Sequence, residues 1–113
     1  MIEEKIKIVT FRDSKESFLS LLDENNIHFI EQVSHPGVVM AAGVIVEILK
    51  VAIPSLAVVV VQWLKARSSR KVMLQTKDRQ IFHLEGYSVQ EVAALLKPAE
   101  SLTVIDTNPN KAN

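Results

Sequence analysis

The hydrophobic and polar positions of the chain follow strand and helix periods in successive blocks. Residues 6 to 11 (IKIVTF) alternate and are rich in β-branched side chains, which predicts a strand. The next block, DSKESFLSLLDENN, repeats apolar residues at helical spacing, and Asp13 with Glu16 forms a capping-box pattern at its start. Residues 27 to 33 (IHFIEQV) predict a second strand, so the chain opens as β-α-β.

The C-terminal half shows a hairpin pattern followed by a helical one. KVMLQT and QIFHLEG alternate on either side of a short polar connection, which predicts a β-hairpin with Val72 and Leu74 on one face. Ser88 and Glu91 form a second capping box, and the apolar residues after it recur at i, i+3, i+4 and i+7. We therefore predict an amphipathic helix that ends at Pro98, and SLTVID after it predicts a short last strand.

The centre of the chain, residues 37 to 67, is an apolar block that interrupts these patterns. Up to its basic end, only Glu47 and Lys50 carry charge, and Pro54 stands in the middle. Proline disrupts a helix interior but fits the first turn, so the block predicts two helices that meet near Pro54, an apolar helical hairpin. In a second interpretation residues 56 to 64 (LAVVVVQWL) form a buried strand, because β-branched residues favour sheets.

Four consecutive valines in this block raise a burial problem. On a helix, Val58, Val59, Val60 and Val61 point all the way round the axis. A helix that is apolar on every side must be buried on every side, and a chain of 113 residues has little other structure to cover it. We therefore predict that these valines and Trp63 contribute to a self-association interface.

Burial in lipid is the alternative explanation for residues 37 to 64. The charge-free run that holds the valines, residues 51 to 64, would make only ~21 Å of helix against a hydrocarbon core of ~30 Å. A single span would also separate the first strand from the hairpin. The flank at residues 65 to 71 could contact phosphate or anionic lipid through a basic patch of Lys65, Arg67, Arg70 and Lys71. We favour burial by protein in the cytoplasm and keep a membrane-associated protein as the alternative.

Composition and charge narrow the classes of function. The chain has 13 basic and 13 acidic residues, so no overall field attracts nucleic acid, and we expect no nucleic-acid partner. It has no cysteine, which removes disulfides, thiolate nucleophiles and cysteine zinc sites. The three histidines lack metal-binding spacing, and no glycine-rich phosphate loop or nucleophile elbow occurs. We expect no catalytic residue, metal or cofactor, and hence not an enzyme.

These patterns together predict an α+β fold around a small mixed sheet. The expected order is β-α-β, an apolar helical hairpin insert at residues 37 to 67, a β-hairpin, a helix and a last strand. We expect residues 1 to 106 to form a single domain and residues 107 to 113 to form a flexible tail. The N-terminus, MIEEKIKIVTF, lacks the apolar region of a secretory signal.

Three motifs follow one another between about residues 37 and 97. A valine-rich helical segment ends in Gln62-Trp63-Leu64-Lys65 and further basic residues, a hairpin strand holds Val72-Met-Leu74, and a capped helix covers residues 88 to 96. This layout resembles the effector-associated constant component family, small modules of bacterial conflict systems. The hairpin turn of that family usually carries a glycine, and KDRQ has none. The resemblance implies a non-enzymatic adaptor that couples effector domains to other parts of a defence system, with itself and another protein as partners.

Overall fold

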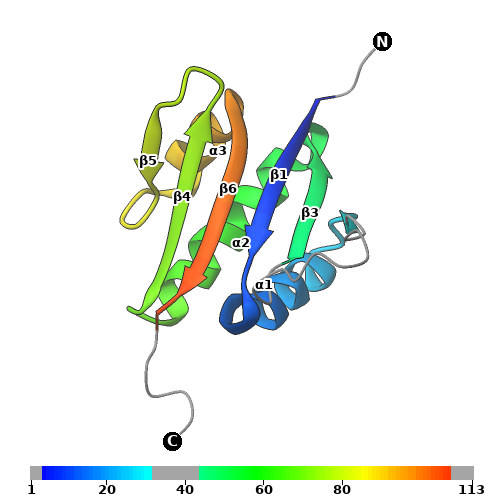
Figure 1. The fold of residues 1–113 in the computed structure, drawn as a ribbon, viewed down its shortest axis with the longest axis vertical. Coiled ribbons are helices and arrows are strands. Elements are labelled where there is room, and N and C mark those ends of the chain that lie inside the picture. Colours follow the sequence, from blue (N-terminus) through cyan, green and yellow to red (C-terminus); the bar gives the residue numbers. More distant parts are fainter. Residues whose placement is uncertain (1–3, 32–43, 108–113) are drawn as a thin grey trace, which may run out of the picture.

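The structure is a computed structural model that describes residues 4–31 and 44–107. They form a six-stranded mixed sheet in the order β2-β3-β1-β6-β4-β5, with three helices on one of its faces (Figure 1). The strands are β1 (Lys5–Thr10), β2 (Ile30–Glu31), β3 (Val44–Leu49), β4 (Arg70–Thr76), β5 (Ile81–His83) and β6 (Ala99–Asp106). The helices are α1 (Arg12–Glu24), α2 (Ile53–Ala66) and α3 (Val89–Leu96), and a short 3-10 turn, η1 (Lys50–Ala52), precedes α2. The predicted α+β class is confirmed. Residues 37–43 of the predicted insert and 108–113 of the predicted tail lie outside the described residues.

The C-terminal half follows the sequence pattern closely. Ser88 Oγ accepts a hydrogen bond from the Glu91 amide at 3.2 Å, and Glu91 Oε1 accepts one from the Ser88 amide at 2.9 Å, so the predicted capping box begins α3. The predicted hairpin forms from β4 and β5, with Val72 and Leu74 both buried on the helix side. The last strand, β6, lies at the centre of the sheet, where it pairs in parallel with β1 and antiparallel with β4.

The start of α1 differs from the prediction because a contact with the sheet determines it. Ser14, not Asp13, holds the first turn: its hydroxyl accepts from the Phe11 amide at 3.0 Å and donates to the Val104 carbonyl of β6 at 2.8 Å. Ser14 is fully buried, so this bond attaches the helix to the centre of the sheet. The capping box predicted from Asp13 and Glu16 is wrong, because α1 already begins at Arg12.

The first half of the predicted helical hairpin is wrong, because Val44–Leu49 is strand β3. It pairs antiparallel with β1 along its whole length and also with the two residues of β2. Val46 and Ile48 are buried against the helices, while Glu47 points to the opposite face beside Lys7 of β1. The alternating VIVEIL pattern therefore belongs to a half-covered strand. Its position beside β1 places the charge of Glu47 on the uncovered face.

The second half of the prediction is confirmed: α2 is a helix with Pro54 in its first turn, and the strand interpretation of residues 56 to 64 is wrong. It is the middle helix of the layer, with α1 on one side, α3 on the other and the sheet beneath (Figure 1). Val59 and Val60 are therefore fully buried, although Val58 is partly exposed. Among the described residues no helix is long and apolar enough to cross a lipid bilayer.

Trp63 connects the helical layer to the end of the sheet. Its indole Nε1 donates to Ser17 Oγ of α1 at 2.8 Å, and its ring meets Phe18 edge to face with centroids 5.6 Å apart. The guanidinium of Arg70 lies 4.6 Å from the ring centroid and also pairs with Asp106 of β6 at 3.3 Å. The fully buried Trp63 thus joins α1, α2 and β4, and Arg70 extends the connection to β6.

The β4–β5 turn holds Arg79 in the left-handed region, at φ 68°. A side chain other than glycine is strained there. We expect Arg79→Gly to stabilise the protein by up to about 1 kcal/mol in urea unfolding. Lys77→Gly, in the same turn but without a positive φ, should instead lose about 0.5–1 kcal/mol. Equal losses in both variants would mean that the backbone at Arg79 is not strained.

Candidate functional site

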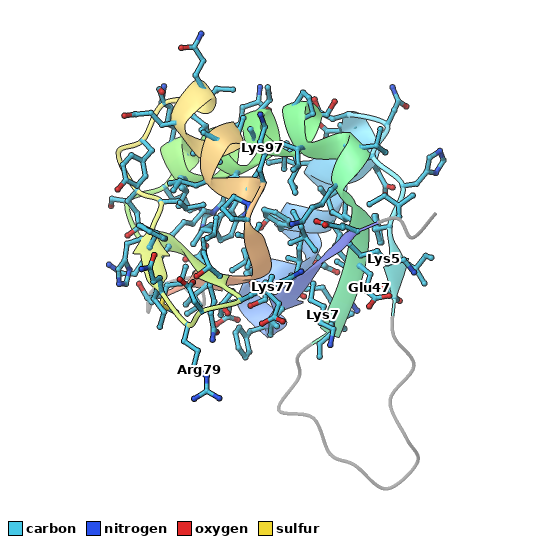
Figure 2. All side chains as sticks on the ribbon, turned by 90° about the horizontal axis from the view of Figure 1, so that it is seen from above. Lys5, Lys7, Glu47, Lys77, Arg79 and Lys97 are labelled. Carbon is cyan, nitrogen blue, oxygen red and sulfur yellow. The ribbon has the colours of Figure 1, made fainter. Side chains whose placement is uncertain are left out.

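The face of the sheet opposite the helices is covered by no described residue, and we call it the open face (Figure 2). Side chains point to it from alternate positions of each strand, between the buried positions that face the helices. Figure 2 shows Lys7 and Arg79 on this side and Lys97 on the helix side. The open face consists of Lys5, Lys7, Val9, Ile30, Ile45, Glu47, Leu49, Lys71, Met73, Gln75, Ile81, His83, Ser101, Thr103 and Ile105.

An apolar row crosses the middle of the open face. The strand register aligns Ile45 with Val9, Val9 with Thr103, and Thr103 with Met73, so these four side chains are consecutive neighbours on β3, β1, β6 and β4. All four are only half-exposed, although no described element lies over them. Side chains at such registered positions on adjacent strands are close enough to interact with one another. Ile105 extends the apolar surface along β6.

One end of the open face is charged. Lys7 lies directly opposite Glu47, and Lys5 Nζ approaches Glu47 Oε1 at 4.0 Å. A shallow cavity of about 470 Å³ opens there, and Lys77 of the β4–β5 turn also lines it. This end of the open face therefore carries cations and carboxylates side by side. Such a surface can pair with either positive or negative groups of a partner.

Glu4 lines this cavity together with Lys50 and Lys77. A hydrogen bond from Lys50 and the positive charges of Lys50 and Lys77 lower the pKa of Glu4 below its ordinary value of 4.5. Lys50 Nζ lies 3.1 Å from Glu4 Oε1 and also donates to the carbonyl of Lys97. Because Glu4 is exposed, this pair fixes the position of Lys50 more than it adds stability.

The residues predicted as a self-association interface all lie on α2, away from the open face. Val59, Val60 and Trp63 are fully buried, Val61 is 6% exposed, and only Val58 is partly exposed. The chain's own sheet, α1 and α3 cover them, so they do not form the exposed surface that the sequence analysis assigned to them. The sequence pattern correctly predicted that most of α2 is buried. It could not identify the elements that cover this helix.

The predicted basic patch is divided among three places. Lys65 and Arg67 are exposed at the end of α2 and just beyond it, whereas Lys71 points to the open face. Arg70 is held inside the protein, where its side chain keeps only 10% of its exposure and pairs with Asp106. These four cations do not make one surface for phosphate or lipid. The described part of the apolar segment lies in strand β3, in η1 and in the largely buried helix α2.

Within the described residues no group of three or more histidines, cysteines, aspartates and glutamates is placed to hold a metal ion. Comparisons of the chain with models of protein families, with curated proteins and with solved structures find no match. The site therefore has to be interpreted from its own geometry.

The apolar row was not predicted from the sequence, although a signal for part of it exists. In IKIVTF and VIVEIL the positions between the buried residues include Val9 and Ile45, which are apolar where a solvated face would be polar. The alternation thus indicates that both faces of these strands carry apolar side chains. That Thr103 and Met73 continue the row depends on strand order, which local patterns do not contain.

Proposed function

We propose that this protein is a non-enzymatic interaction module that self-associates through the open face of its sheet. The observation that supports this proposal most directly is the apolar row of Ile45, Val9, Thr103 and Met73, which no described element covers. Apolar surface removed from water contributes about 25 cal/mol per Å², so a second layer over this row would be stabilising. Two sheets that pack face to face bury such rows against each other.

The size of the open face sets the strength of association that we expect. The strands hold 6, 2, 6, 7, 3 and 8 residues, 32 in all, and at about 3.3 Å per residue and 4.8 Å between strands they give a flat area of roughly 500 Å². A stable interface of standard size buries about 800 Å² on each partner. The open face is smaller than that, which favours a weak and reversible dimer over a permanent one.

The charged end of the open face is compatible with a second copy of the same chain. In a dimer with two-fold symmetry the same patch lies on both sides of the interface. Because Lys5 and Lys7 stand beside Glu47, the lysines of one copy can lie opposite the carboxylate of the other. A surface of one sign would repel its own copy.

The test of this proposal is Val9→Lys, which places a charge in the middle of the apolar row. We expect the wild-type mass to rise with protein concentration in sedimentation or light scattering, and the variant to remain monomeric. The matched control is Val51→Lys, because Val51 of η1 is 81% exposed and outside the open face. The control should associate as the wild type does.

A second variant separates loss of association from loss of folding. Thr103→Lys adds a charge in the same row while removing little apolar surface, and it should also abolish association. Circular dichroism and thermal melting identify variants that fold. A wild type that stays monomeric at every concentration would refute self-association, and folded Val9→Lys and Thr103→Lys variants that still associate would refute the open face as its site.

The resemblance to the effector-associated constant component family extends this proposal to a second kind of partner. A module of that family would link effector components in a bacterial defence system, in the cytoplasm. The order of the valine-rich helix, the hairpin and the Ser88-capped helix supports this link. Chains that co-purify with the wild type but not with Val9→Lys would be the partners that depend on the open face.

A further inference from the structure

A cleft of about 380 Å³ lies away from the open face, at the C-terminal end of α2. One wall is the last turn of α2 with the residues after it, and the other is the loop that leads from β5 to α3. In Figure 1 this loop lies beside the middle of β4, and the Leu84 amide donates to the Val72 carbonyl of that strand at 3.0 Å. The cleft falls within the size range of small-molecule sites.

The floor of the cleft is apolar. Val61 and Leu84 line it and are almost completely buried, with exposures of 6% and 0%. Leu64 is half-buried on the α2 side, and Tyr87 presents a partly exposed ring from the loop. A ligand seated here would therefore contact aliphatic side chains below and an aromatic ring at the rim.

The acidic groups of the cleft are already bonded to the backbone. Glu85 Oε2 accepts from the Val72 amide at 3.0 Å, and Glu91 Oε1 accepts from the Ser88 amide at 2.9 Å. Arg70 is also engaged, since its guanidinium donates to the Trp63 carbonyl at 3.0 Å and pairs with Asp106. These three groups hold the walls in place.

Two cations of the cleft have no such partner among the described residues. Lys65 and Arg67 are exposed on its α2 side, and neither forms an ion pair with any residue in 4–31 or 44–107. Glu85 and Glu91 keep their negative charges, but each directs an oxygen to a backbone amide, and neither forms an ion pair with Lys65 or Arg67. The charge that complements them is an anion, and the surface beneath them is suited to a hydrocarbon body.

We propose that this cleft binds a small amphipathic carboxylate. The apolar part of the ligand rests on Val61, Leu64 and Leu84, and its carboxylate lies between Lys65 and Arg67. Each half alone is a weak ligand, because the cations are exposed to water and the floor is small. This site is independent of the open face, so its occupancy does not require self-association.

The test is a titration of isotope-labelled protein with octanoate, followed by amide chemical shifts. We expect saturable shifts at residues 64 to 67 and 84 to 88, and at least tenfold weaker binding of acetate, which lacks the chain, and of octanamide, which lacks the charge. The double variant Lys65→Gln with Arg67→Gln should weaken octanoate binding at least tenfold. The matched control is Lys77→Gln with Arg79→Gln, a lysine and an arginine at the same spacing in the β4–β5 turn, and it should bind as the wild type does.

Several results would overturn this inference. One is the absence of saturable shifts up to millimolar octanoate, and another is shifts that map to the open face. Equal binding of acetate and octanoate would leave only an anion site, and equal loss in both double variants would leave only a general charge effect. All substituted side chains are exposed, so the amide spectrum should keep its folded pattern in each variant.

Discussion

Trp63→Ala is expected to lower the free energy of unfolding by about 3–5 kcal/mol, the range for a large aromatic residue truncated in a core. Trp63 is fully buried, and the substitution removes its contacts with Phe18 and Arg70 as well as its hydrogen bond to Ser17. It also leaves the Ser17 hydroxyl without its indole donor and uncovers one side of the Arg70 guanidinium. Domains of this size are stable by only about 5–15 kcal/mol, so the loss is a large fraction of the total.

Urea unfolding followed by circular dichroism measures this loss. Gln62→Ala is the matched control, because the neighbouring position of α2 is exposed, and it should change the free energy of unfolding by less than about 0.5 kcal/mol. Trp63→Phe keeps part of the ring volume and should fall between the two. If Trp63→Ala were as stable as Gln62→Ala, the indole would not lie in the core and α2 would be rotated from its described position.

Val60→Asp is expected to prevent folding. Val60 is fully buried at the centre of the helical layer, and burial of a valine side chain contributes about 1.5–3 kcal/mol. A carboxylate at the same place has no cation to pair with among the core residues, and an unpaired buried charge costs several kcal/mol more. The sum is comparable to the whole stability of a small domain.

The measurement is the fraction of soluble, folded protein together with its melting temperature. Val51→Asp is the control, since it makes the same chemical change at a position that is 81% exposed, and it should fold and melt close to the wild type. If the Val60→Asp protein folds normally but its assembly in solution changes mass, α2 would form the interface that was predicted from the sequence. An unchanged melting temperature and mass would place Val60 at the surface.

Local chemistry explains which parts of the fold were predictable. The Ser88–Glu91 capping box and the hairpin depend on residues a few positions apart, so their patterns were sufficient. The start of α1 was not, because Ser14 bonds to Val104, ninety positions away. Strand β3 was missed for the same reason. Nearly all of its positions are apolar, so next to a long apolar run its pattern does not distinguish a strand from a helix. Only its pairing with β1 and β2 makes it a strand.

The same distinction between local and long-range information applies to the candidate site. Residue types alone predicted that α2 needs burial on nearly every side. Residue types could not show that α1 and α3 cover α2. They also could not show that the row from Ile45 to Met73 forms. The first depends on how the helices pack, and the second on four strands that are distant in sequence.

By itself, the sequence of this protein determined the periods of its segments, its balance of charge and the amount of apolar surface to be hidden. The tertiary structure decided that the valine helix is covered within one chain, that the cations of residues 65 to 71 separate, and that no residue in 4–31 or 44–107 covers the second face of the sheet. The physical reason is that periodicity records which side of a segment avoids water. It does not record which other segment, or which other molecule, takes the place of the water.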